Sequence, residues 1–96
     1  MGDEPGNAIE VEIEIVNDQG LHMRPVMRLT ELAMQFKSDI RLCKGDIIAD
    51  ARSPMEMMLL DAPKGTRLKL RALGEDAKAA VEAITEFAAR KFSDEG

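Results

Sequence analysis

The hydrophobic period changes from one segment to the next, and this order of periods limits the folds that the chain can adopt. Residues 9–16 alternate strictly, with Ile and Val on one side and Glu on the other, as in a strand with one buried face. Residues 23–36 instead carry apolar side chains at helical spacing, and Pro25 stands where the first turn of a helix tolerates proline. The first two predicted elements are therefore a strand and a helix.

The remaining elements follow from the same two patterns. Alternation and turn residues predict three more strands, at residues 39–43, 46–51 and 66–72, the first two joined by a turn at Lys44-Gly45. Helical spacing predicts two more helices, at residues 54–60 and from about 75 to 92. The predicted order is βαββαβα.

Residues at the helix ends support these boundaries. Ser53 followed by Pro54 is typical of an N-cap and the first helical position. The last helix is predicted to have an acidic first turn, with Glu75 and Asp76, and a basic last turn, with Arg90 and Lys91. Both charges suit the helix dipole.

Charge on two of the strands predicts how the sheet is assembled. The first strand exposes Glu10, Glu12 and Glu14, and the fourth exposes Arg67, Lys69 and Arg71. Opposite charges on facing strands attract, so these two strands are expected to be neighbours. We predict an α+β fold, an open-faced sandwich with a four-stranded antiparallel sheet and three helices on one face. Residues 9–92 would form the domain, with a flexible leader at 1–8 and a flexible tail at 93–96.

Composition removes several classes of function. The chain has 96 residues, enough for one domain, and its net charge of −5 argues against binding to nucleic acid or to an anionic membrane. Three Phe and no Trp or Tyr leave few platforms on which bases can stack, which argues against a nucleic-acid binder of the RRM type.

The single Cys43 allows no internal disulfide and no cysteine cluster, so neither a metal nor a cofactor is expected. The sequence has no stretch of transmembrane length and no signal-peptide pattern. We therefore expect a cytoplasmic protein that is a monomer.

His22 is the only histidine, and it falls at or next to the start of the first predicted helix. Free backbone N–H groups and the positive end of the helix dipole favour an anion there, by about 0.3–1 kcal/mol at an exposed site. Arg24 can bind phosphate oxygens through two N–H groups. A neutral imidazole in this position is a candidate nucleophile that would accept a phosphoryl group. The alternative is that His22 is an ordinary capping or surface residue.

The segment GLHMRP, Gly20–Pro25, resembles the phosphohistidine signature of HPr, the histidine-containing phosphocarrier of the bacterial phosphotransferase system. The resemblance extends to the preceding strand, the following helix, the segment 51–60, the turn at 64–66 and the closing helix. It therefore covers about residues 9–92.

This resemblance implies a set of partners and roles. His22 would be phosphorylated on Nδ1 by enzyme I, with phosphoenolpyruvate as the ultimate donor, and would pass the group to a histidine or cysteine of an EIIA-type acceptor. Arg24 would help to hold the phosphoryl group, and catalysis would belong largely to the partners. Met23 departs from the family, which usually has a small residue after the histidine, and is expected to affect access to the ring or the choice of partner.

Ser53 resembles the serine that HPr kinase phosphorylates in some bacteria, which would make HPr kinase/phosphorylase a further partner. Pro54 stands where the family usually has a large aliphatic residue, and plain capping by Ser53 is the simpler interpretation.

The three methionines that follow are predicted to have two different roles. Met57 is expected in the core together with Leu60, whereas Met55 and Met58 are expected, together with Met23, on a partner-docking surface beside the histidine.

Two hypotheses of different classes follow. The first is a phosphocarrier in a sugar or nitrogen branch of a phosphotransferase system. The alternative is a regulatory binding module that is controlled by phosphorylation of Ser53 or His22. The presence of both His22 and Arg24 favours the phosphocarrier.

Overall fold

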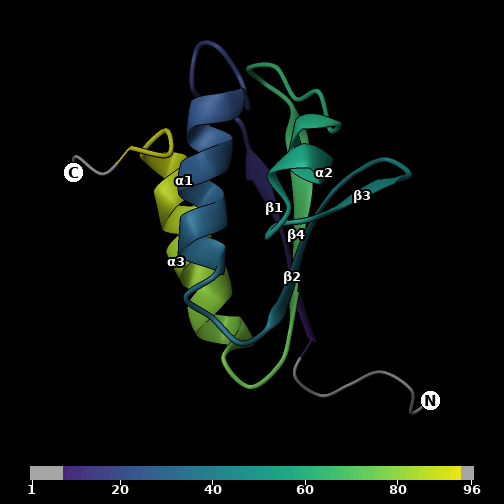
Figure 1. Ribbon diagram of the computed structural model, residues 1–96, viewed down its shortest axis with the longest axis vertical. Coiled ribbons are helices and arrows are strands. Elements are labelled where there is room, and N and C mark those ends of the chain that lie inside the picture. Colours follow the sequence, from purple (N-terminus) through teal and green to yellow (C-terminus); the bar gives the residue numbers. More distant parts are fainter. Residues whose placement is uncertain (1–7, 94–96) are drawn as a thin grey trace.

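The computed structural model describes residues 8–93, and the predicted order βαββαβα is confirmed (Figure 1). The elements are β1 (Ala8–Glu14), α1 (Met23–Ala33), β2 (Asp39–Lys44), β3 (Ile47–Asp50), α2 (Pro54–Met58), β4 (Arg67–Leu73) and α3 (Ala77–Ala89). Ala8, predicted to lie in the leader, is the first residue of β1. The rest of the predicted leader and residues 94–96 of the predicted tail lie outside the described residues.

The four strands form one antiparallel sheet in the order β1-β4-β2-β3. The pairing of β1 with β4 that charge predicted is confirmed, and Glu12 is the register partner of Lys69. The ion pairs are diagonal, however: Arg67 contacts Glu12 and Lys69 contacts Glu10, each at 3.3 Å. All four side chains are solvent-exposed, so each pair contributes about 0.2–1 kcal/mol and mainly supports the register.

The helices cover one face of the sheet and leave the other open, as predicted for an open-faced sandwich (Figure 1). Helix α3 packs against β1, β4 and β2, whereas α2 packs against α1 and β3. The core between the layers is made of fully buried aliphatic side chains, among them Val26, Leu29, Leu42, Leu68, Leu70 and Ile84. Burial of this one sheet face provides the main hydrophobic stabilisation of the domain.

The first two helices end earlier than predicted, and the third, Ala77–Ala89, is shorter than predicted at both ends. Helix α1 ends at Ala33 instead of continuing to residue 36, because i→i+3 hydrogen bonds replace the helical pattern there: Gln35 N–H donates to Leu32 O and Phe36 N–H to Ala33 O. Phe36 remains packed against the core even so. Helix α2 ends at Met58 rather than at residue 60.

The charged turns predicted for the last helix are wrong. Helix α3 spans Ala77–Ala89, with Asp76 as its N-cap, so that neither its first nor its last turn carries a charge of the predicted sign. The Asp76 carboxylate makes no capping hydrogen bond to its own helix. It accepts hydrogen bonds from the backbone N–H groups of Lys37 and Ser38, at 2.8 and 2.9 Å, and from the Ser38 hydroxyl. Asp76 therefore links the entry to α3 with the entry to β2.

The turn between β2 and β3 is also displaced from its prediction. It consists of Gly45 and Asp46, because Lys44 still pairs with Ile47 in the ladder. Gly45 adopts a left-handed conformation with φ of 60°, which glycine allows without a steric penalty.

Candidate functional site

His22 is the N-cap of α1, and its imidazole takes no part in the cap. Its backbone is extended and its carbonyl oxygen accepts the N–H of Val26 at 3.0 Å, but its side chain makes no capping hydrogen bond. The half-buried ring is therefore available at the positive end of the helix dipole. The predicted location at the helix start is confirmed.

The loop before His22 is held by close packing on a second loop. Gly20 has φ of 74°, and a Cβ there would lie 2.7 Å from Cα of Pro63. Leu21 is buried, and its N–H donates to the carbonyl oxygen of Ala62 at 2.8 Å. Asn17 adds a hydrogen bond from its side-chain amide to the Gly20 carbonyl oxygen. These contacts determine where His22 stands.

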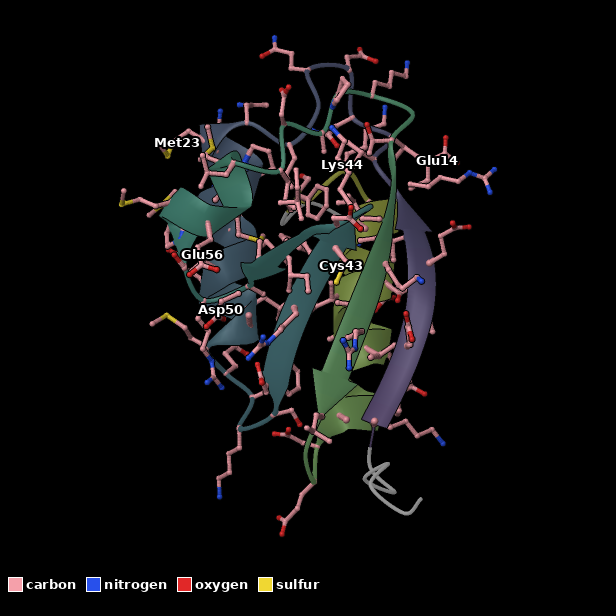
Figure 2. The ribbon with its side chains drawn as sticks, turned by 90° about the vertical axis from the view of Figure 1, so that its right-hand side faces the viewer. Glu14, Met23, Cys43, Lys44, Asp50 and Glu56 are labelled. Carbon is pink, nitrogen blue, oxygen red and sulfur yellow. The ribbon has the colours of Figure 1, made fainter. Side chains whose placement is uncertain are left out.

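Lys44, at the end of β2, supports that second loop (Figure 2). Its Nζ donates to the carbonyl oxygens of Leu60 and Asp61 at 3.1 and 2.6 Å, and Asp61 adopts a left-handed φ of 50°. The next residue is Ala62, whose carbonyl binds Leu21. The sequence offers no signal for this role, because a lysine at a strand end is usually solvated.

A surface hollow of about 720 Å³ opens beside His22. Its walls come from the loop before α1, from the first turns of α1 and from the residues that follow α3: Asn17, Asp18, Gln19, His22, Arg24, Pro25, Arg28, Lys91, Phe92 and Ser93. Arg24, for which the sequence predicts phosphate binding, is one of these lining residues. Arg28 and Lys91 were not predicted, although Arg28 follows Arg24 by four residues and therefore shares its helix face.

The described charged residues that line the hollow are mostly cationic although the whole chain is acidic. Among the described residues 8–93, its lining combines three cations, Arg24, Arg28 and Lys91, with one carboxylate, that of Asp18. The hydrogen bond and charge of Lys64, followed by the charge of Lys91, hold the pKa of Asp18 below its usual value. A hollow with this charge balance favours a dianion such as a phosphoryl group.

Exposed apolar side chains occur on α1, on α2 and at the C-cap of α2, and these two helices pack against each other. We call these side chains the apolar surface; they are Met23, Met27, Met55, Met58 and Leu59. Figure 2 shows Met23 next to α2. The predicted core positions of Met57 and Leu60 are confirmed, since both are fully buried. Leu59, which is 72% exposed, was not singled out from the sequence because its neighbour Leu60 belongs to the core.

Ser53 is the N-cap of α2, which confirms the capping prediction. Its Oγ accepts the N–H of Glu56 at 3.3 Å, and the Glu56 carboxylate accepts the N–H of Asp50 at 2.9 Å. Figure 2 shows Asp50 and Glu56 beside each other. Phosphorylation of Ser53 stays a prediction.

The part of the chain that the structure describes contains neither a metal-binding cluster nor a membrane-spanning helix. Within residues 8–93 no three His, Cys, Asp or Glu side chains are grouped so that they would hold a metal ion. Over the same residues no helix combines the length and apolar character needed to cross a membrane. Cys43 is a half-buried residue of β2.

The fold and this histidine site match one protein family. Residues 9–90 match the family model described as "PTS HPr component phosphorylation site". The phosphocarrier protein HPr of Neisseria meningitidis (serogroup A) is 38% identical over 79 residues, which cover 82% of this chain and 89% of that protein. The phosphocarrier protein NPr of Shewanella violacea is 33% identical over 86 residues, covering 90% and 94%.

Solved structures agree with this assignment. The crystal structure of HPr-C-His from Thermoanaerobacter tengcongensis superposes with a TM-score of 0.85 at 36% identity, covering 92% of this chain and 99% of that one. The chain belongs to the HPr family of phosphocarriers of the phosphotransferase system.

Proposed function

We propose that His22 of this chain accepts a phosphoryl group from enzyme I, for which phosphoenolpyruvate is the ultimate donor, and passes it to an EIIA-type acceptor. The observation that carries the proposal is the position of the His22 imidazole, which makes no capping hydrogen bond, at the N-terminus of α1. It lies beside a hollow that is lined by three cations. Family membership supports the same assignment, because the match spans the whole segment around His22.

The chemistry is the transfer of a phosphoryl group onto a nitrogen of His22 and then off it again. Nδ1 of His22 would attack the phosphorus carried by enzyme I, and the bond from phosphorus to the donor atom of enzyme I would break as the new P–N bond forms. In the transition state, negative charge lies on the oxygens of the transferring phosphoryl group, and catalysis consists mainly of stabilising this charge electrostatically. Arg24 lies two residues after His22 and lines the same hollow, and its guanidinium would bind these oxygens.

The apolar surface would be the docking site for both partners. Met23, Met55 and Met58 belong to it, and Met23 directly follows His22, so a bound partner would lie over the imidazole. Flexible thioethers adapt to different partner surfaces, which suits a carrier that binds donor and acceptor in turn. Relatives named HPr and NPr both match, so the acceptor is proposed to be of EIIA type in a sugar or nitrogen branch. The carrier would act as a cytoplasmic monomer.

The alternative function, a binding module regulated through phosphorylation of Ser53 by an HPr kinase, receives less support. The Glu56 carboxylate lies at the same N-cap and is bound to the N–H of Asp50. A phosphate on Ser53 would meet this negative charge as well as the favourable helix start.

The test is incubation of the chain with its cognate enzyme I and radiolabelled phosphoenolpyruvate. We expect an acid-labile, base-stable label on the wild type and none on His22→Ala. Arg24→Ala should keep its fold, measured by circular dichroism, and accept phosphate more slowly by on the order of tenfold or more. A wild type that takes up no label would overturn the proposal, and an unchanged rate for Arg24→Ala would remove the role of the guanidinium.

A further inference from the structure

We propose that Lys91 is a second phosphoryl-binding cation of the His22 site, delivered by the turn that ends α3. The inference rests on the proposed function of His22 and assigns a residue that lies 69 positions further along the chain. Figure 1 shows the end of α3 next to the first turns of α1, and both segments line the hollow.

The turn after α3 has the hydrogen bonds of a Schellman motif. The N–H of Lys91 donates to the Ala88 carbonyl at 3.0 Å, and the N–H of Phe92 donates to the Phe87 carbonyl at 2.8 Å. The buried Phe92 ring packs edge-on against Phe87, with the ring centres 5.6 Å apart. This apolar contact anchors the backbone of the turn from which the exposed Lys91 side chain extends.

Lysine is an unusual residue at this point of the motif. Lys91 and Phe92 have φ of 62° and 58°, a left-handed conformation that favours glycine, and glycine is the common residue at the position of Lys91. Strained backbone of this kind persists where the surrounding structure enforces it, and it is found preferentially at functional sites. The turn therefore carries a lysine at a position where glycine would be more stable.

The charge of Lys91 acts within the hollow. Lys64 is the main cause of the lowered pKa of the Asp18 carboxylate, and Lys91 contributes to it through its charge. Asp18 belongs to the loop before His22, so the field of Lys91 extends to the histidine side of the site. Arg24 and Lys91 reach the hollow from different elements, α1 and the end of α3, and together would hold a dianion from two sides.

The experiment separates the charge of Lys91 from the stability of the turn. In Lys91→Gly the left-handed position is occupied by the residue that suits it, so Tm should rise by several degrees. Single-turnover transfer from phosphorylated enzyme I should nevertheless slow by about three- to tenfold. Lys91→Arg should keep a rate close to that of the wild type, because the charge is retained.

The neighbouring residue provides a matched control. Arg90 is the exposed C-cap of α3 and does not line the hollow, so Arg90→Gln should transfer like the wild type whereas Lys91→Gln should be slow. If Lys91→Gly and Lys91→Gln both transfer at the rate of a labelled wild type, Lys91 has no role and the function of His22 still holds. If the wild type takes no label, the proposed function and this inference both fall.

Discussion

Gly20 lies against Ala62 so closely that a Cβ on the glycine would stand 2.6 Å from the Ala62 carbonyl oxygen. That same oxygen accepts the N–H of Leu21 at 2.8 Å, one residue before His22. The position of the histidine thus depends on contact between two loops that are 42 residues apart.

Gly20→Ala should therefore destabilise the domain and displace the histidine loop. The methyl group meets backbone atoms that cannot rotate away, and the left-handed φ of 74° adds strain. We expect a loss of about 2–4 kcal/mol in the free energy of unfolding, measured by urea denaturation.

Gly45→Ala is the matched control for this prediction. Gly45 also has a left-handed backbone, with φ of 60°, but nothing lies within 4 Å of the position that a Cβ would take. Its free energy of unfolding should fall by only about 1 kcal/mol, the cost of placing alanine in a left-handed conformation. Equal losses in the two variants would show that contact between the loops contributes nothing.

The apolar surface should contribute to partner binding but not to stability. Met55 and Leu59 are 81% and 72% exposed, so the double variant Met55→Gln, Leu59→Gln should unfold within about 0.5 kcal/mol of the wild type. Its Kd for enzyme I, measured by calorimetry, should rise by about tenfold or more, since buried apolar anchors dominate interface energies.

Met34 offers a comparison at the other end of α1. It is the C-cap of that helix and is 64% exposed, so Met34→Gln makes the same chemical change far from His22. If this variant weakened binding as much as the double variant, the docking site would not be the apolar surface.

Asp76 should make stability fall as the solution becomes acidic. Hydrogen bonds from the Ser38 hydroxyl, then from the backbone N–H groups of Lys37 and Ser38, lower the pKa of Asp76 in the folded state. A carboxylate with a lowered folded pKa stabilises the fold above its unfolded pKa of about 3.8, and this stabilisation is lost as pH falls through the folded value.

Urea unfolding of the wild type and of Asp76→Asn between pH 6 and pH 3 measures this effect. The variant should be less stable at pH 6, and its stability should fall less steeply below pH 4. Ser38→Ala, which removes the largest cause of the shift, should have an intermediate slope. Parallel pH profiles for the wild type and Asp76→Asn would contradict the assignment.

Local pattern was enough to predict the elements, because strand and helix periods are properties of short segments. The charges on residues 9–16 and 66–72 were enough to predict that β1 pairs with β4, because the acidic exposed face of one strand attracts the basic exposed face of the other. The ends of α1 and α3 were placed less well. The end of α1 is decided by hydrogen bonds such as that from the N–H of Gln35 to the carbonyl oxygen of Leu32. Helix α3 starts after its N-cap Asp76, whose carboxylate binds the N–H of Ser38 in another loop.

The sequence by itself therefore determined the order of the elements, the pairing of β1 with β4, and the place of His22 and Arg24 at the start of a helix. Only the tertiary structure decided that Lys91 and Arg28 line the same hollow, and that Ala62 and Lys44 hold the histidine loop. The physical reason is that these contacts join segments far apart in the chain. The left-handed turn at Lys91 is moreover enforced by the buried Phe92 and is not a preference of lysine itself.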